Sequence, residues 1–298
     1  MSSILTAETI ADAQALFVKT PLSRRTFVAG TLGAGFAAAV MPVAAQNVIK
    51  TDSVGLDVAQ VQIPVGVELL PAYVAKPTGK TALPVILVVQ EIFGVHEHIA
   101  DVCRRFAKLG YLAIAPELYF RQGDPKAYTD IPKLMSEIVS KVPDAQVMSD
   151  LDATVSWALA KDGSEKIGIT GFCWGGRITW MFAAHNKTVK AAVAWYGRLI
   201  GQPSAMSPTH PIDVVNMLNA PVLGLYGEAD TGIPVDTVWK MQEALKASTN
   251  SNARKSEFKI YDQAPHAFHA DYRPTYRKEA AEDGWKRAIA WFKANAVA

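Results

Sequence analysis

The sequence predicts an α/β protein in which a mostly parallel sheet of about eight strands carries helices on both faces. Short apolar runs of strand length alternate along the chain with segments whose apolar residues recur at helical spacing. This alternation is typical of a parallel sheet that is covered on both sides. The composition agrees, because 50% of the 298 residues are hydrophobic and only 19% are charged. Such a chain buries a full core and is too apolar to be intrinsically disordered.

Eight segments are expected to be strands. Residues 56–63 and 67–75 alternate apolar and polar side chains, and the short Val65-Gly66 connection favours a hairpin between them. The remaining strands are short and mostly apolar, as expected of strands buried on both faces. They are expected at residues 84–90, 111–115, 166–170, 189–195, 222–226 and 257–261.

Five helices are expected between or after these strands. Apolar residues at helical spacing predict one helix over about 99–109, which Gly110 ends, and a long one over 147–159, which Asp162-Gly163 ends. The others are expected at residues 175–185, 235–245 and 279–292. Residues 46–298 contain no internal repeat or low-complexity linker, so we interpret them as a single domain.

Residues 1–45 are expected to be a signal peptide rather than part of the fold. Arg24 and Arg25 lie in a Ser-Arg-Arg-Thr-Phe-Val motif, a small apolar run follows at 29–40, and Ala45 ends a candidate cleavage site. The run is too short and glycine-rich for a permanent membrane anchor. The segment resembles bacterial twin-arginine signals, which implies that the export machinery carries the folded protein to the periplasm. The alternative is a buried N-terminal helix in a cytoplasmic protein.

Charge and cysteine content exclude several classes of function. The chain has 30 basic and 28 acidic residues, a net charge of +2, so no nucleic-acid partner is expected. Cys103 and Cys173 are the two cysteines, too few for a disulfide framework, and Cys103 is expected to pack against the sheet. The His96-Glu97-His98 pair lacks a third metal ligand, and no nucleotide-binding loop is present, so neither a metal nor a cofactor is expected.

A candidate nucleophile follows the predicted strand at 166–170. The sequence Gly171-Phe-Cys173-Trp-Gly175 lies between that strand and a predicted helix, the setting of a nucleophile elbow. The sharp turn requires small neighbours, and it places Cys173 at a helix N-terminus, where the helix dipole stabilises a thiolate. The motif alone is equally compatible with a buried cysteine beside two packing glycines.

Two further residues complete a candidate triad. Asp230 and His266 each follow a predicted strand, and open α/β sheets place their sites at the carboxyl ends of strands. Their order along the chain, after the nucleophile, is the one this type of elbow requires. Asp230 would orient His266, which would exchange protons with the thiol. Glu228 and His269 are the competing acid and histidine.

From about residue 56 onward the chain resembles the dienelactone hydrolase family, the carboxymethylenebutenolidases. The motifs that carry the resemblance are Gln-Glu-Ile-Phe-Gly at 90–94, Ala-Pro-Glu-Leu-Tyr at 115–119, Gly-Phe-Cys-Trp-Gly-Gly at 171–176, Gly-Glu-Ala-Asp at 227–230 and Pro-His-Ala-Phe at 265–268. A cysteine elbow together with Gln-Glu-Ile-Phe-Gly is specific to this family among proteins of the α/β-hydrolase fold. The resemblance implies cofactor-free hydrolysis of small lactones or esters through an acyl-cysteine intermediate.

The resemblance also implies roles for residues outside the triad. Glu91 matches a glutamate that hydrogen-bonds the resting thiol until substrate displaces it. The backbone N–H groups of Ile92 and Trp174 would form the oxyanion hole. Arg121 matches an arginine that binds the carboxylate of the substrate.

One departure from the family concerns the substrate. Well-known members carry a second carboxylate-binding arginine at the position of Ala270, and Arg273 is a candidate to replace it. Two other interpretations therefore remain open. The scaffold could act on a different substrate as a general carboxylesterase or thioesterase. Cys173 could instead serve a non-catalytic redox sensor or binding module, although such a sensor needs no triad.

Overall fold

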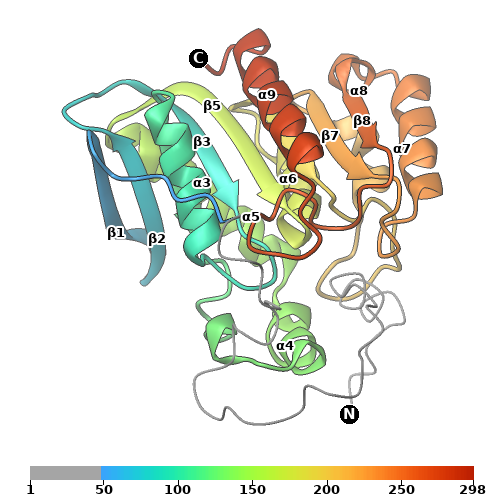
Figure 1. The fold of residues 1–298 in the computed structure, drawn as a ribbon, viewed down its shortest axis with the longest axis horizontal. Helices are drawn as coiled ribbons and strands as arrows, with labels where there is room; N and C mark the ends of the chain where they lie inside the picture. The colour runs from blue at the N-terminus through green and yellow to red at the C-terminus, as the bar shows by residue number, and fades with distance from the viewer. Residues whose placement is uncertain (1–47) are drawn as a thin grey trace.

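The computed structural model describes residues 48–298, and these residues form one sheet with helices on both faces (Figure 1). The predicted signal peptide at residues 1–45 lies outside the described residues, so it stays a prediction. Within residues 48–298, no helix is both long and apolar enough to cross a membrane.

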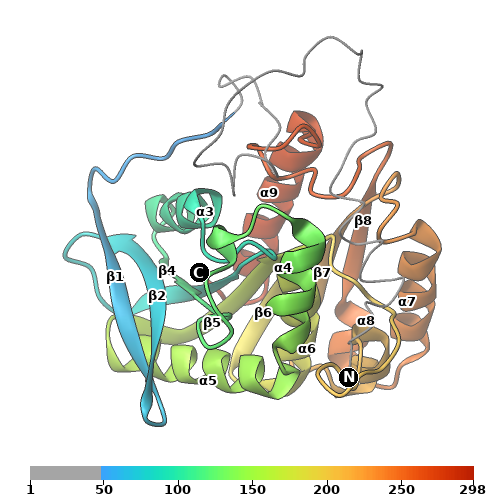
Figure 2. The same cartoon turned by 90° about the horizontal axis from the view of Figure 1, so that it is seen from below.

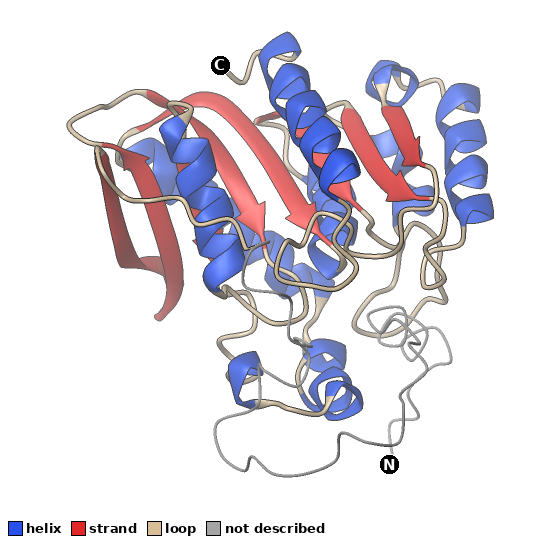
Figure 3. Cartoon of the chain, viewed as in Figure 1, coloured by secondary structure: helices blue, strands red, loops and turns tan. Residues whose placement is uncertain are grey.

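The central sheet has eight strands in the order β1-β2-β4-β3-β5-β6-β7-β8. β1 pairs antiparallel with β2, β2 pairs antiparallel with β4, and the remaining neighbours are parallel. Figure 3 shows the strands of this sheet in red and the helices in blue. The strands are β1 (Leu56–Val65), β2 (Glu68–Pro77), β3 (Leu83–Val89), β4 (Leu112–Pro116), β5 (Gly163–Phe172), β6 (Val189–Trp195), β7 (Val222–Gly227) and β8 (Glu257–Tyr261). The fold class is thus confirmed, as is the predicted hairpin, in which Val65 pairs with Glu68.

The helices form a layer on each side of the sheet. The α-helices are α3 (Glu97–Lys108), α4 (Ile131–Glu137), α5 (Asp144–Ala160), α6 (Trp174–His185), α7 (Val235–Ala247), α8 (Ser251–Lys255) and α9 (Lys278–Ala294). Short 3-10 turns occupy Pro125–Ala127, Val139–Lys141 and Pro211–Met217. Figure 2 shows α3 and α9 on one face of the sheet and α5 and α6 on the other.

The core follows from the alternation of side chains along buried strands. In β3, Val85, Leu87 and Val89 belong to the core under α5 and α6, whereas Ile86 and Val88 belong to the core under α3 and α9. Successive strand residues point to opposite faces. Because both faces are covered, the strand is apolar at every one of these positions, the pattern from which it was predicted.

Two short helices were not predicted. α4 spans Ile131–Glu137 and α8 spans Ser251–Lys255. Neither is long enough to produce a periodic apolar pattern, and each depends on a local cap. The Asp130 carboxylate accepts the N–H of Lys133 at 2.9 Å, and the Asn250 side chain accepts the N–H groups of Asn252 and Ala253. α4 lies beyond the carboxyl edge of the sheet (Figure 1).

Candidate active site

The predicted site residues follow the carboxyl ends of neighbouring parallel strands. Glu91 follows β3, Cys173 follows β5, Asp230 follows β7 and His266 follows β8. Since β3, β5, β6, β7 and β8 run parallel and lie side by side, the loops that leave them share one edge of the sheet. The topology therefore brings together residues separated by up to 175 positions.

Cys173 occupies a strained turn between β5 and α6. Its backbone has φ 55° and ψ −116°, in a region that side chains rarely adopt, and its N–H donates to the carbonyl of Trp195 at 3.0 Å. The turn is possible because its neighbours have no side chain. A Cβ on Gly171 would lie 2.2 Å from the carbonyl oxygen of Gly175, and one on Gly175 would lie 2.4 Å from that of Gln90. This is the geometry expected of a nucleophile elbow.

Asp230 and His266 form a buried hydrogen-bonded pair. The Nδ1–H of His266 donates to Oδ2 of Asp230 at 2.7 Å, and each side chain is 1% exposed. The other carboxylate oxygen of Asp230 accepts the backbone N–H groups of Gly232 at 2.9 Å and Ile233 at 3.0 Å. Both oxygens are thereby held in place, and the tautomer of His266 is set. The Nε2 atom of His266 has no hydrogen-bond partner among residues 48–298.

The surroundings of His266 favour its charged form. Burial lowers the pKa of this imidazole, but the charges of Asp230 and Cys173 outweigh burial and raise the pKa well above its ordinary value. Because the charge of Cys173 acts on this pKa, the sulfur of Cys173 lies close to the imidazole ring. The structure thus brings the three predicted triad residues together.

The competing acid and histidine lie in different surroundings. Glu228 is exposed, and within the described residues it accepts a long contact of 3.4 Å from the N–H of Gln263. His269 is buried between Phe172 and Trp195, with ring centroids 5.1 Å and 4.4 Å away. Burial lowers the pKa of His269 well below its ordinary value, and neighbouring positive charges lower it further. Neither residue is placed to replace Asp230 or His266.

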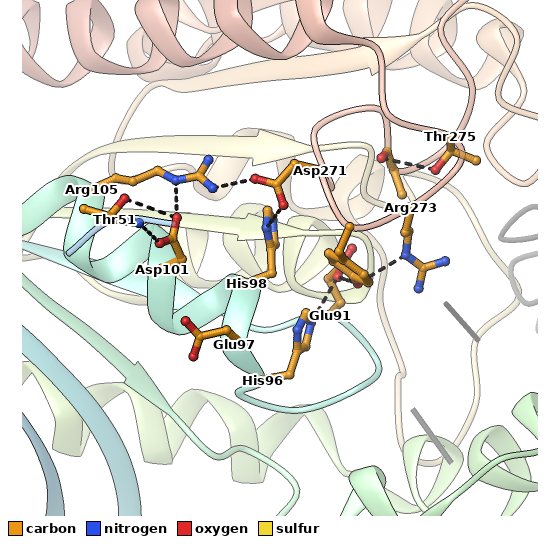
Figure 4. A network of polar contacts seen from close by, with 12 residues as sticks. Thr51, Glu91, His96, Glu97, His98, Asp101, Arg105, Asp271, Arg273 and Thr275 are labelled. Carbon is orange, nitrogen blue, oxygen red and sulfur yellow. Dashed lines mark hydrogen bonds and ion pairs between the residues drawn. The ribbon is translucent and has the colours of Figure 1, made fainter. Parts of the chain in front are cut away.

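Glu91 is buried at the end of β3 with partners that the sequence did not indicate. One carboxylate oxygen accepts the hydroxyl of Tyr272 at 2.5 Å and is 3.3 Å from Nε2 of His96 (Figure 4). Burial alone would raise the pKa of Glu91, but the contact with His96 and the charge of Arg273 lower it below its ordinary range. The second oxygen has no hydrogen-bond partner among the described residues. The expected bond to the Cys173 thiol is therefore not formed in this structure.

Arg273 lies beside Tyr272 and Phe93, and its predicted role in binding a carboxylate stays a prediction. Its side chain is buried, its Nε donates to the hydroxyl of Tyr272 at 3.2 Å, and its guanidinium lies 4.8 Å from the ring centre of Phe93. Burial disfavours the charged form, yet the charges of Tyr272, Glu91 and Cys173 raise the pKa of Arg273 above its ordinary value. Its Nη2 has no hydrogen-bond partner within residues 48–298. A buried guanidinium with an unused donor is suited to bind an anion.

Arg121 is engaged elsewhere. Its guanidinium donates to both oxygens of Asp150, at 2.8 Å and 3.1 Å, and it also pairs with Glu68. It stacks 4.2 Å from the ring centre of Phe120. None of the contacts found for the described residues joins Arg121 to the triad. To bind a substrate it would have to leave Asp150, so its predicted role stays a prediction.

The two predicted oxyanion-hole amides come from segments that touch. Trp174 is the first residue of α6, so its N–H has no acceptor within the helix. Ile92 follows β3, and the start of α6 packs closely on the end of that strand through Gly175. The elbow and the loop after β3 are therefore neighbours, as an oxyanion hole requires.

The remaining candidates have structural partners. His96 contacts Glu91, whereas His98 lies 3.2 Å from Asp271, so the His-Glu-His sequence does not form a metal pair. Within the described part of the chain, no three His, Cys, Asp or Glu side chains are grouped to hold a metal ion. Cys103 is fully buried on α3, and burial raises the pKa of its thiol. Its predicted packing against the sheet is confirmed.

Sequence reasoning missed a buried polar network that joins two loops of the site. Tyr272 links Glu91 to Arg273, and Asp271 links His98 to Arg105 on α3 (Figure 4). The loop after β8 is thereby tied to the loop after β3. The one available signal was the proximity of these polar residues to His266 in the chain.

Comparisons with known proteins agree with this geometry. The sequence profile of the dienelactone hydrolase family matches residues 70–296. A protein of Methylorubrum extorquens named as a carboxymethylenebutenolidase is 59% identical, over 97% of this chain and 98% of its own length. A Salmonella typhimurium protein of the same name is 55% identical, over 87% of this chain and 94% of its own length. A crystal structure described as a dienelactone hydrolase of Klebsiella pneumoniae has 57% identity and a TM-score of 0.77, and it covers 80% of this chain and 98% of its own. The chain therefore belongs to the dienelactone hydrolase family and is an ester-bond hydrolase with the α/β-hydrolase fold.

Proposed function

We propose that this enzyme hydrolyses small lactones or esters that bear a carboxylate, through an acyl-Cys173 intermediate. The observation that carries the proposal is the buried hydrogen bond between His266 and Asp230, which leaves Nε2 of His266 available beside the elbow cysteine. The raised pKa of His266 favours an imidazolium next to the sulfur of Cys173.

The proposed reaction has two halves. In the first, the sulfur of Cys173 attacks the ester carbonyl, and the backbone N–H groups of Ile92 and Trp174 stabilise the oxyanion. The C–O bond breaks as His266 gives its proton to the departing oxygen. In the second, His266 takes a proton from water as the water oxygen attacks the thioester carbonyl. The C–S bond then breaks, which releases the acid and returns the sulfur of Cys173 beside the protonated His266. Asp230 holds the imidazole throughout.

Arg273 is the favoured group for the substrate carboxylate. Its buried Nη2 has no hydrogen-bond partner among residues 48–298, and Cys173 is among the charges that raise the pKa of Arg273. The names of the relatives describe hydrolysis of a butenolide that carries a carboxymethylene group, a lactone with a carboxylate. One charge-assisted hydrogen bond contributes roughly 1.5–3 kcal/mol, enough to select such a substrate over a neutral one.

The test is direct detection of the intermediate. The enzyme is mixed with p-nitrophenyl acetate and quenched in acid, and peptide mass spectrometry locates the acetyl group. We expect acetylation of Cys173 alone and no hydrolysis by Cys173→Ala, with Cys103→Ala as the control that keeps full activity. Acetylation of another residue, or turnover by Cys173→Ala within about tenfold of the parent, would contradict the proposal.

A general carboxylesterase or thioesterase is the second candidate. It is favoured by the ion pairs that hold Arg121 and by Ala270 at the position of the second arginine, because together they leave one buried guanidinium at the site. A panel that pairs each anionic lactone with its methyl ester distinguishes the two. A clear preference for the anion supports the lactonase, and equal rates support the general esterase.

A further inference from the structure

Tyr196 is a residue at the site to which the mechanism above gives no role. It directly follows β6, its side chain is fully buried, and its backbone φ is +37°. Such a backbone conformation is unusual for a tyrosine and persists only where the surroundings impose it. Here the N–H of Tyr196 donates to the carbonyl of Leu225 at 2.9 Å, and Gly197 packs directly on α6.

The hydroxyl of Tyr196 has no hydrogen-bond partner among residues 48–298. Burying an unpaired hydroxyl costs free energy, and such groups are rare in folded proteins. The ring is held edge-on against His266, with centroids 5.1 Å apart, and against Phe268 at 5.3 Å. A strained backbone and an unpaired hydroxyl thus coincide in one residue beside the catalytic histidine.

The charges around this hydroxyl keep it protonated. Burial raises the pKa of Tyr196 well above its ordinary value, and the charges of Glu91, Tyr272 and Cys173 raise it further. The hydroxyl is therefore a stable hydrogen-bond donor within the electrostatic reach of the nucleophile. It is suited to donate a hydrogen bond to an oxygen that gains negative charge during the reaction.

The order of the strands indicates which oxygen of a bound ester the Tyr196 hydroxyl would meet. β5, which carries Cys173, lies between β3 and β6. The oxyanion-hole residue Ile92 follows β3, whereas Tyr196 follows β6 and contacts His266. A carbonyl oxygen bound on the β3 side directs the other ester oxygen toward the side of Tyr196 and His266.

We propose that the hydroxyl of Tyr196 donates a hydrogen bond to the leaving-group oxygen of the bound ester or lactone. The inference rests on the proposed function. As the bond between Cys173 sulfur and the acyl carbon forms, the C–O bond breaks and its electron pair moves to the leaving oxygen. That oxygen takes the proton from Nε2 of His266, while Tyr196 keeps its own proton and stabilises the charge that develops.

The experiment compares Tyr196→Phe with the parent on two acetate esters. Because the acyl group is the same, differences in kcat/KM report the first half-reaction alone. Ethoxide is a poor leaving group and needs the donor, whereas p-nitrophenolate is stable without it. We expect kcat/KM to fall about tenfold or more for ethyl acetate, the effect of one hydrogen bond to a developing charge, and less than about twofold for p-nitrophenyl acetate. The melting temperature should not fall, since the lost hydroxyl was unpaired.

Tyr111→Phe is the matched control. Tyr111 is also buried with an unpaired hydroxyl within the described residues, but it precedes β4, at the opposite edge of the sheet. It should leave both esters unaffected. Equal losses on the two esters, no loss on either, or a loss accompanied by a lower melting temperature would overturn the role of Tyr196. Cys173→Ala separates the two proposals, because activity in that variant overturns the proposed function itself.

Discussion

Asp230→Asn tests whether the carboxylate of Asp230 holds His266 in the tautomer that can take a proton from Cys173. One oxygen of Asp230 accepts two backbone N–H groups, from Gly232 and Ile233, and the other accepts Nδ1–H of His266. In the variant, the amide oxygen will keep the two backbone donors, so the NH₂ group must face His266. The imidazole then accepts at Nδ1 and carries its proton on Nε2, the tautomer that cannot take a proton from the thiol.

The expected loss in kcat is large. The same change of tautomer in an Asp-His pair of serine proteases costs about four powers of ten, and a cysteine nucleophile needs less help from its base. We therefore expect a loss of about 10³- to 10⁴-fold, which corresponds to roughly 4–5.5 kcal/mol in the activation barrier. The pKa of His266 should fall as well, because the charge of Asp230 is the largest contribution that raises it.

The assay is steady-state hydrolysis of p-nitrophenyl acetate, together with an NMR titration of the His266 ring. Glu228→Gln is the matched control, since this exposed acid lies two residues before Asp230 and should leave both readouts unchanged. An Asp230→Asn enzyme that retains kcat within about tenfold of the parent, with the pKa of His266 unmoved, would refute the reasoning.

Three further outcomes are expected. Burial would raise the pKa of Asp271, but the hydrogen bond and charge of His98 hold it at about 2, below the ordinary 3.8. The stability this provides is present above pH 4 and lost as the pH falls toward 2, so Asp271→Asn should reduce the free energy of unfolding by about 2 kcal/mol at pH 7. Urea unfolding should show parent and variant converging at low pH, and a constant difference would contradict this. Arg273→Met should lower kcat/KM for a carboxylate-bearing lactone about ten- to a hundredfold and leave kcat/KM for its neutral methyl ester unchanged. Equal losses on the two substrates would show that Arg273 does not bind the carboxylate. Replacing Arg24 and Arg25 by lysine should retain the precursor in the cytoplasm in cell fractionation, whereas unchanged periplasmic protein would argue against the twin-arginine route.

The sheet and the nucleophile elbow could be predicted because local sequence determines them. β3 is apolar on both faces, and Gly171 and Gly175 flank Cys173 as the turn demands. Asp230 and His266 could be predicted because each follows a parallel strand, and the carboxyl ends of parallel strands lie at one edge of the sheet whatever the order of the strands. These features depend on short segments or on topology alone.

The contacts that could not be predicted join residues far apart in the chain. Tyr272 bonds Glu91 across 181 residues, and no pattern near either residue indicates that pairing. The partners of Arg121 are also distant in the chain, since Asp150 on α5 is 29 residues away and Glu68 on β2 is 53 residues away. A resemblance to a family suggests what an arginine could bind. It does not reveal which carboxylates already compete for it.

The contact between Gly175 and the end of β3 has a consequence for protein engineering. It joins the proposed nucleophile and the proposed oxyanion-binding loop into one closely packed block, in which even a methyl group at position 175 would collide with the backbone. A library randomised within this block will return mostly inactive variants. New substrate preferences should come instead from the loop after β8, which carries Arg273 and lies outside this contact.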